Sequence, residues 1–163
     1  MSLKCSLALG MQSGKIPNLA ITAASNFGGH EAWRGRLNNF PAMPYDTTKS
    51  TGSWTASVKQ VGQYLQVDLG VITYVTMVAT QGRPYAYNQY VTMYSLAYGF
   101  NKDTFVEFKV SNTVKVFQAN ADRDTIVTHA LPEKIRCRYI RFVVKGWNVY
   151  ISMRAEVYGC PEY

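Results

Sequence analysis

The chain has 163 residues, of which 47% are hydrophobic and 17% are charged, and its formal net charge is +7. This composition excludes an intrinsically disordered chain, and no apolar run approaches the roughly 20 residues of a membrane-spanning helix. We expect a single globular domain over residues 1–163 with its core between residues 5 and 160. Met1–Leu3 are expected to be an added expression start, and any signal peptide to have been removed.

The basic excess favours an acidic partner such as anionic lipid, sulfated glycan or nucleic acid. Lys and Arg are nevertheless scattered along the chain, with no dense run and no basic stripe at helical spacing. We therefore expect no nucleic-acid partner.

Three cysteines stand far apart in the sequence. Cys5 lies near the start and Cys160 near the end, which favours a disulfide joining the two termini in an oxidising compartment. The alternative is three reduced thiols in a cytosolic protein.

The stretch "SNFGGHEAW" (25–33) has neither a helical nor a strand period, although it holds large aromatic residues that a solvated loop normally avoids. Residues 40–62 and 82–88 are also aperiodic. In a sandwich such loops gather at the ends of the scaffold, where binding usually resides.

Strand-like runs separated by turn residues fill the chain from residue 64 onward. The run "YLQVDLG" alternates, with Leu65, Val67 and Leu69 on one face. The predicted strands are 64–70, 71–80, 89–99, 104–110, 114–120, 124–131, 138–144 and 152–160. No segment keeps an apolar 3.6-residue period long enough for a substantial helix. The pattern predicts an all-β fold, an antiparallel sandwich or barrel.

Face assignment within residues 138–144 puts Ile140, Phe142 and Val144 on one side of the strand. Cys137 falls on the opposite face in this register. We expect it to be an unpaired packing thiol, although an exposed thiol there could form dimers.

Catalytic and metal motifs are missing from the sequence. His30 and His129 stand in no metal-ligand spacing, and there is neither a nucleophile elbow nor a CxxC pair. Asp122 and Asp124 lack the rest of a calcium loop, so we expect them in a turn. We predict no enzymatic activity and no cofactor; calcium is left open without a motif to support it.

Taken in order, "LGMQSGKIPNLAITAAS", "GRLN", "GSW", "YLQVDLG", "TQGR", "YVTMYSLAYG", "VFQANADRDT", "RYIRF" and "MRAEVYGC" resemble the coagulation factor V/VIII type C domains, also called discoidin domains. The resemblance spans Cys5 to Cys160. It implies an eight-stranded jelly-roll-like sandwich related to galactose-binding domains, one disulfide joining the ends, and an extracellular, secreted or cell-surface setting.

Members of this family bind phosphatidylserine, galactose-type sugars, collagen or other proteins through hairpin loops called spikes. By motif, the three spikes are Asn26–Trp33, Ala56–Gly62 and Pro84–Asn88. The candidate ligand-binding residues are Phe27, His30, Glu31, Trp33, Arg34, Val58, Lys59, Arg83, Tyr85, Tyr87 and Asn88. Trp33 is expected at the base of the first spike, whereas Phe27 could contact ligand or pack.

Two ligand classes fit these loops. In the carbohydrate interpretation, Arg83 matches an arginine of sugar-binding discoidins, with His30, Glu31, Tyr85, Tyr87 and Asn88 completing the site; Arg83 could instead brace its loop. In the lipid interpretation, Tyr85, Tyr87 and Val58 insert into an anionic membrane while Lys59, Arg34 and Arg83 face its headgroups.

Capture of a C-terminal arginine, as in neuropilin-like members, uses an acidic residue in the second spike, and "TASVKQVGQY" has none. A structural module without a ligand is the remaining alternative. Asp68, Arg138, Arg141, Arg154 and Glu156 are expected in internal ion pairs or hydrogen bonds. The sequence thus predicts a non-catalytic extracellular binding and adhesion module of a multidomain protein, for a glycan or another cell-surface ligand, alternatively for anionic phospholipid.

Overall fold

The computed structural model describes residues 4–41, 52–85 and 87–162. Met1–Leu3, for which an added start was expected, lie outside this part. Within it, no helix has the length and hydrophobicity needed to cross a membrane. The elements are β1 (Leu7–Ala8), η1 (Asn18–Ala20), β2 (Ile21–Ala23), η2 (Ala32–Arg34), β3 (Trp54–Thr55), β4 (Tyr64–Gln81), β5 (Tyr90–Gly99), β6 (Val106–Glu107), β7 (Lys109–Val110), β8 (Thr113–Val114), β9 (Val116–Gln118), β10 (Val127–Asn148) and β11 (Ser152–Pro161).

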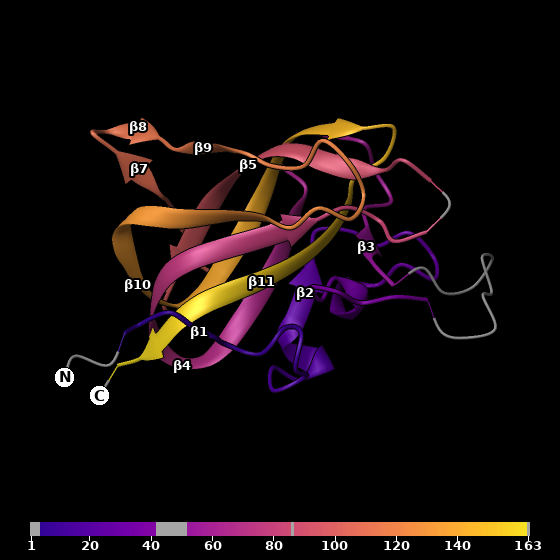
Figure 1. The fold of residues 1–163 in the computed structure, drawn as a ribbon. Helices are drawn as coiled ribbons and strands as arrows, with labels where there is room; N and C mark the ends of the chain where they lie inside the picture. The colour runs from indigo at the N-terminus through magenta and orange to yellow at the C-terminus, as the bar shows by residue number, and fades with distance from the viewer. Residues whose placement is uncertain (1–3, 42–51, 86, 163) are drawn as a thin grey trace.

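Four long strands, β4, β5, β10 and β11, form the scaffold, and the short strands pair along their edges. The sheet order is β1-β11-β4-β10-β5-β6, and the pairs formed by these strands are antiparallel. Figure 1 shows the long strands curving around one another, with both termini at one end and β3 toward the other. The predicted all-β antiparallel fold is confirmed.

Two pairs of predicted strands are continuous in the structure. Residues 64–70 and 71–80 together form β4, which bends between Asp68 and Thr73 without leaving the sheet. Gly70 lies at this bend with a φ of +82°, and its N–H donates to Asp68 Oδ1 at 2.8 Å. Only glycine takes this left-handed conformation at little cost, so the turn signal that suggested two strands marks a bend within one.

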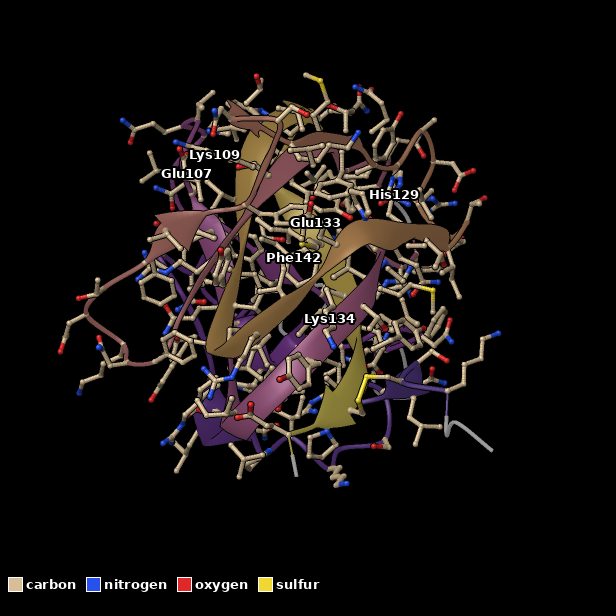
Figure 2. All side chains as sticks on the ribbon, turned by 90° about the vertical axis from the view of Figure 1, so that its left-hand side faces the viewer. Glu107, Lys109, His129, Glu133, Lys134 and Phe142 are labelled. Carbon is tan, nitrogen blue, oxygen red and sulfur yellow. A yellow bond between two sulfur atoms is a disulfide. The ribbon has the colours of Figure 1, made fainter. Side chains whose placement is uncertain are left out.

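β10 likewise joins the predicted runs 124–131 and 138–144. Its register against β4 shifts between Ala130 and Ile135, so the residues between them bulge from the ladder. Figure 2 shows Glu133 and Lys134 on this outer stretch, whereas Phe142 is buried inside the molecule. By contrast, the predicted strands 104–110 and 114–120 are broken into β6, β7, β8 and β9.

The predicted face of Cys137 is wrong. The side chain is fully buried in the same core cluster as Ile140 and Phe142. The reason is a second register shift, between Cys137 and Tyr139, where one residue of β10 lies opposite four of β4, and the alternation of buried residues along β10 changes there. Burial raises the pKa of this free thiol to about 12, so Cys137 packs as a small apolar side chain.

The predicted disulfide is confirmed at the end where the termini meet. Cys5 and Cys160 are bonded across a sequence separation of 155 residues. The adjoining strand pair β1–β11 places Leu7 opposite Gly159. The bond therefore closes nearly the whole chain at one edge of the sheet.

The expected internal roles of the charged strand residues are also met. Arg138 donates two hydrogen bonds to Asp68, and Arg141 stacks on Tyr64 while donating to a glutamine on β4. Glu156 is buried and accepts backbone N–H bonds from residues 10–12. These groups hold strands and the N-terminal segment together rather than facing a ligand.

Candidate functional site

The first predicted spike is shaped by a tight turn from Phe27 to His30. His30 N–H donates to the Phe27 carbonyl at 2.9 Å, and Gly29 takes a φ of +79° within the turn. Two further backbone bonds connect the turn to Thr55 of β3. The buried Trp54 indole donates to the Ser25 carbonyl at 2.9 Å. The loop is thus fastened to the scaffold on both sides.

The third predicted spike begins where β4 ends. Arg83 N–H donates to the Gln89 carbonyl at 2.9 Å, which closes the loop at its base. Arg154, on β11, supports this base from below: its guanidinium donates to the backbone carbonyls of Gly82, Asn39 and Arg123.

A connection that the sequence analysis did not single out, residues 149–151 between β10 and β11, lies between the second and third spikes. Lys59 of the second spike stacks its ammonium over the Tyr150 ring at 4.5 Å. Asn148, at the end of β10, donates from its side chain to the Asn88 carbonyl at 2.7 Å. Val149 is 58% exposed and has a φ of +64°, a strained conformation for a β-branched residue.

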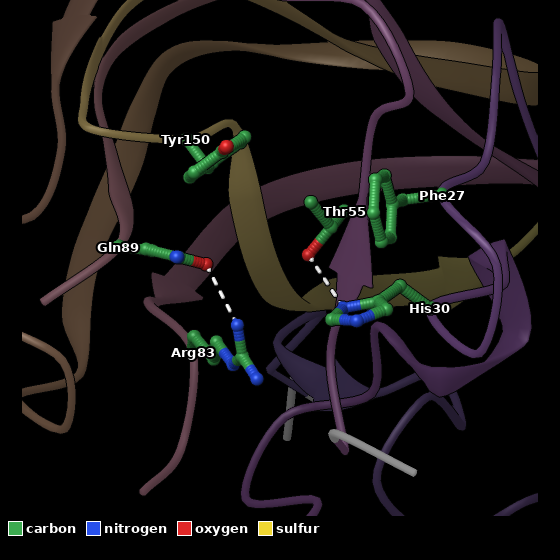
Figure 3. A pocket seen from close by; sticks show the side chains of 6 residues that line it. All are labelled: Phe27, His30, Thr55, Arg83, Gln89 and Tyr150. Carbon is green, nitrogen blue, oxygen red and sulfur yellow. Dashed lines mark hydrogen bonds between the residues drawn. The ribbon is translucent and has the colours of Figure 1, made fainter. Parts of the chain in front are cut away.

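The first spike, β3, the base of the third spike and the 149–151 connection supply the lining of a pocket of about 190 Å³. The pocket combines three predicted residues with three that the sequence analysis missed. Its lining consists of Phe27, His30, Thr55, Arg83, Gln89 and Tyr150. In Figure 3 the rings of Phe27 and Tyr150 lie on one side and Arg83 and His30 on the other.

The missed residues carried only weak signals. Thr55 and Gln89 are each one residue outside a predicted spike; Thr55 falls in the aperiodic stretch 40–62 and Gln89 at the start of the predicted strand 89–99. Tyr150 lies in "KGWNVY", a stretch between two predicted strands that could have been treated as a fourth loop.

A chain of hydrogen bonds crosses the pocket floor and fixes the polar groups in it. Gln89 Oε1 accepts from Arg83 Nη1 at 3.0 Å, and Ser152 Oγ lies 3.4 Å from the same oxygen. Thr55 Oγ1 lies 2.7 Å from Ser152 Oγ and 3.0 Å from His30 Nδ1. Because a guanidinium only donates, the amide oxygen of Gln89 must face Arg83.

The direction of the remaining bonds follows from that amide. Ser152 donates to Gln89, so Thr55 must donate to Ser152, and His30 Nδ1–H must donate to Thr55 if every contact is a hydrogen bond. Nδ1 of His30 therefore carries a proton. Burial and then the charge of Arg83 lower the pKa of His30 to about 4, which favours the neutral form of the ring at neutral pH.

Arg83 is 9% exposed and held in a defined plane. Its guanidinium carbon lies 4.6 Å from the centre of the Tyr87 ring, and burial lowers its pKa from the usual range. An arginine remains charged at neutral pH even so. The pocket floor therefore carries one positive charge beside a neutral histidine.

The remaining predicted residues lie outside the pocket lining. Glu31 pairs with Arg34, whose bond lowers the pKa of the Glu31 carboxyl, and Arg34 stacks over Trp33 at 4.2 Å. Trp33 packs against the core from η2, in keeping with its expected place at the base of the first spike. These three side chains contact one another in sequence beside the pocket and support the first spike.

The exposed side chains at the tips of the second and third spikes are called the rim. Val58, Tyr85 and Tyr87 are each about half exposed, and Asn88 is exposed next to Gln89. Tyr85 has a φ of +61°, the left-handed region that non-glycine residues rarely adopt. Among the described residues, no group of three or more His, Cys, Asp or Glu side chains gathers where a metal ion could be held.

Comparison with known proteins gives one family and one fold. The F5/8 type C domain family matches residues 20–157. Neuropilin-1 of Rattus norvegicus is 34% identical over 161 residues, which cover 96% of this chain but only 16% of the relative.

Solved structures agree on the fold. Discoidin II of Dictyostelium discoideum superposes with a TM-score of 0.83 at 24% identity, over 97% of this chain and 60% of that chain. The family 32 CBM of Clostridium perfringens NanJ, solved in complex with galactose, gives a TM-score of 0.62 at 19% identity, over 94% of this chain and 98% of that one.

Proposed function

The chain belongs to the F5/8 type C domain family, and we propose that it is a non-catalytic extracellular binding module that takes a carbohydrate into the pocket lined by Phe27, Arg83 and Tyr150. The observation that carries this proposal is the pairing of two accessible aromatic rings with a fixed polar floor. Phe27 is 50% exposed and Tyr150 38% exposed. Aromatic faces with a few placed polar groups suit the apolar faces and hydroxyls of a sugar ring.

Two further features support the proposal. A solved neighbour of the same fold holds galactose, which makes sugars the first ligand class to test. The disulfide between Cys5 and Cys160 fits a secreted or cell-surface location, and the short stretch of neuropilin-1 that the chain matches fits one module of a larger protein.

The proposal is tested on a glycan array, followed by calorimetry with the best-bound glycan. Arg83→Ala removes charge-assisted hydrogen bonds worth roughly 1.5–3 kcal/mol, so affinity should fall at least about tenfold. Lys109→Ala is the control, because it removes one charge from the exposed β7 strand and should leave affinity unchanged. Absence of any glycan binding by the folded protein would overturn the proposal.

Docking on anionic phospholipid is the second candidate, favoured by the exposed apolar rim. Val61 and Val149 are 56% and 58% exposed, close in kind to the tips of Val58, Tyr85 and Tyr87. Lys59 stands among them over Tyr150. Such a rim could enter the interface of a membrane while the cation meets headgroups.

Co-sedimentation with vesicles that contain or lack phosphatidylserine separates this candidate from the first. Binding that needs phosphatidylserine and is lost in the double variant Tyr85→Ser, Tyr87→Ser supports docking. Equal sedimentation of the wild type and the double variant with these vesicles, while glycan binding is intact, contradicts docking on phospholipid.

A further inference from the structure

Two buried arginines lie on neighbouring parts of this end of the molecule, and they differ in how their hydrogen bonds are satisfied. Arg154 is 2% exposed, donates from Nε, Nη1 and Nη2 to backbone carbonyls, and also pairs with Asp124 at 3.1 Å. Arg83 donates from Nη1 to Gln89, but its buried Nε–H finds no hydrogen-bond partner in the described part of the chain.

Arg83 also has no counterion among the described residues, where the arginine–carboxylate pairs involve other arginines. The pocket lining itself contains no Asp or Glu. A buried charge without a counterion is unfavourable, and an anion bound beside the guanidinium in the pocket relieves this cost. Burial lowers the pKa of Arg83, which reflects the same cost of holding the charged form away from water.

The neighbouring hydrogen-bond acceptors of the pocket floor cannot neutralise the charge of Arg83, because they are uncharged and already take part in other hydrogen bonds. Gln89 Oε1 accepts from Arg83 and Ser152, and Thr55 Oγ1 takes part in bonds to Ser152 and His30. What the floor offers a ligand at Arg83 is therefore a donor edge with a positive charge. A carboxylate matches the planar fork of a guanidinium better than a hydroxyl does.

We infer that the pocket selects an acidic sugar, one in which a pyranose ring carries a carboxylate as in a hexuronic acid. This inference rests on the proposed function, since it names the class of sugar bound in that same pocket. The ring lies between Phe27 and Tyr150 and the carboxylate pairs with Arg83. Tyr87, stacked on the guanidinium, keeps the plane of Arg83 fixed for this contact.

The test uses sugars that differ only at the acidic group. Calorimetry compares methyl galactopyranoside with methyl galacturonopyranoside, and the glucose and mannose pairs likewise, at pH 7 and at low and high NaCl. In at least one pair the uronide should bind the wild-type protein at least tenfold more tightly than the neutral glycoside. Raising the NaCl concentration should weaken binding of the uronide and leave binding of the neutral glycoside unaffected, because only the uronide makes an ionic contact with the protein.

Two variants test whether Arg83 causes the preference for the uronide over the neutral glycoside. Arg83→Gln should remove the difference between uronide and glycoside, and Arg83→Lys should retain only part of it, since an ammonium keeps the charge but loses the fork. Near-ultraviolet circular dichroism establishes that each variant is folded. The comparison on the wild-type protein stands even if neither variant folds.

The outcomes separate this inference from the proposed function. Neutral sugars binding as tightly as uronides would overturn the inference and leave the carbohydrate function standing. No binding of any sugar, on the array or by calorimetry, would overturn both. Binding of phosphatidylserine vesicles that depends on Arg83, without sugar binding, would likewise overturn both in favour of a lipid headgroup.

Discussion

His30 is a buried imidazole whose environment favours the neutral form. Its Nδ1–H is committed to Thr55 by the bond directions that start at Arg83, and the nearby guanidinium charge opposes protonation. His30 therefore acts as part of the pocket floor, because three hydrogen-bond contacts connect it through Thr55 and Ser152 to Gln89. Its contribution is to hold shape rather than to sense physiological pH.

This state of His30 predicts a pH dependence of stability. The folded pKa of about 4 lies below the ordinary value of 6.5, so the unfolded chain binds more protons between these values, and stability falls as pH drops from about 6.5 to about 4. Urea unfolding of the wild type and of His30→Gln at several pH values measures this. The variant should lose less stability over that window; identical pH profiles would contradict the prediction.

Val149 has a positive φ, and relieving this backbone strain should stabilise the protein. An L-amino acid in the left-handed region costs roughly 1–2 kcal/mol, whereas Asn tolerates it, so Val149→Asn should stabilise the fold by about 1 kcal/mol. Val61→Asn is the matched control: Val61 is similarly exposed, its φ is not positive, and no gain is expected. Denaturation midpoints of the two variants and the wild type measure these changes in stability. Equal changes for Val149→Asn and Val61→Asn would refute the role of backbone strain.

At the scale of elements, β11 is the strand that links stability to the site. One end bonds the N-terminal strand and carries Cys160, the middle pairs with β4, and the other end supplies Ser152 and Arg154 to the pocket floor and loop bases. Its register against β4 shifts between Tyr158 and Gly159. At that point the two backbones approach so closely that only a glycine fits.

Gly159→Ala tests this close approach. A Cβ there would lie 1.9 Å from the carbonyl oxygen of Tyr74, so the strands would have to separate, and the loss of stability should reach about 1–3 kcal/mol or more. Gly28→Ala is the control, because its added Cβ meets no heavy atom within 4 Å, and it should stay within about 0.5 kcal/mol. Thermal unfolding of both variants gives the comparison.

The whole molecule divides its tasks between two ends. The termini and the disulfide lie at one end, and β3 with its neighbouring loops lies toward the other (Figure 1). Between them the apolar core, with Trp54, Tyr94, Phe117 and Phe142 among its largest side chains, forms a rigid body. Changes at the disulfide should therefore affect stability without altering the pocket.

Removing the disulfide provides that test. The double variant Cys5→Ser, Cys160→Ser should lose about 2–5 kcal/mol of unfolding free energy, since a long closed loop constrains the unfolded chain. Where the variant is still fully folded, its affinity for the array-selected glycan should stay within about twofold of wild type. Dithiothreitol should destabilise the wild type and leave the variant unchanged; a large loss of affinity in the folded variant would contradict the separation of the two ends.

The site could be predicted from the sequence only as loops, not as a pocket. Motifs placed Phe27 and His30 in the first predicted spike and Arg83 directly before the third, and all three line the cavity. Their roles as ligand contacts stay predictions. Thr55, Gln89 and Tyr150 escaped notice because pocket membership depends on which segments meet in space, and a residue one position outside a loop carries no separate signal.

The sequence by itself determined the all-β class, the family and the pairing of Cys5 with Cys160, because period-two patterning, turn residues and ordered motifs are local properties that a single chain displays directly. Only the tertiary structure decided which face Cys137 occupies and that Arg83 has no counterion within the described residues 4–41, 52–85 and 87–162. A bulge reverses alternation without changing composition, and a charge is unpaired only in relation to side chains brought to it from distant parts of the chain. Register and long-range proximity are set by packing of the whole molecule.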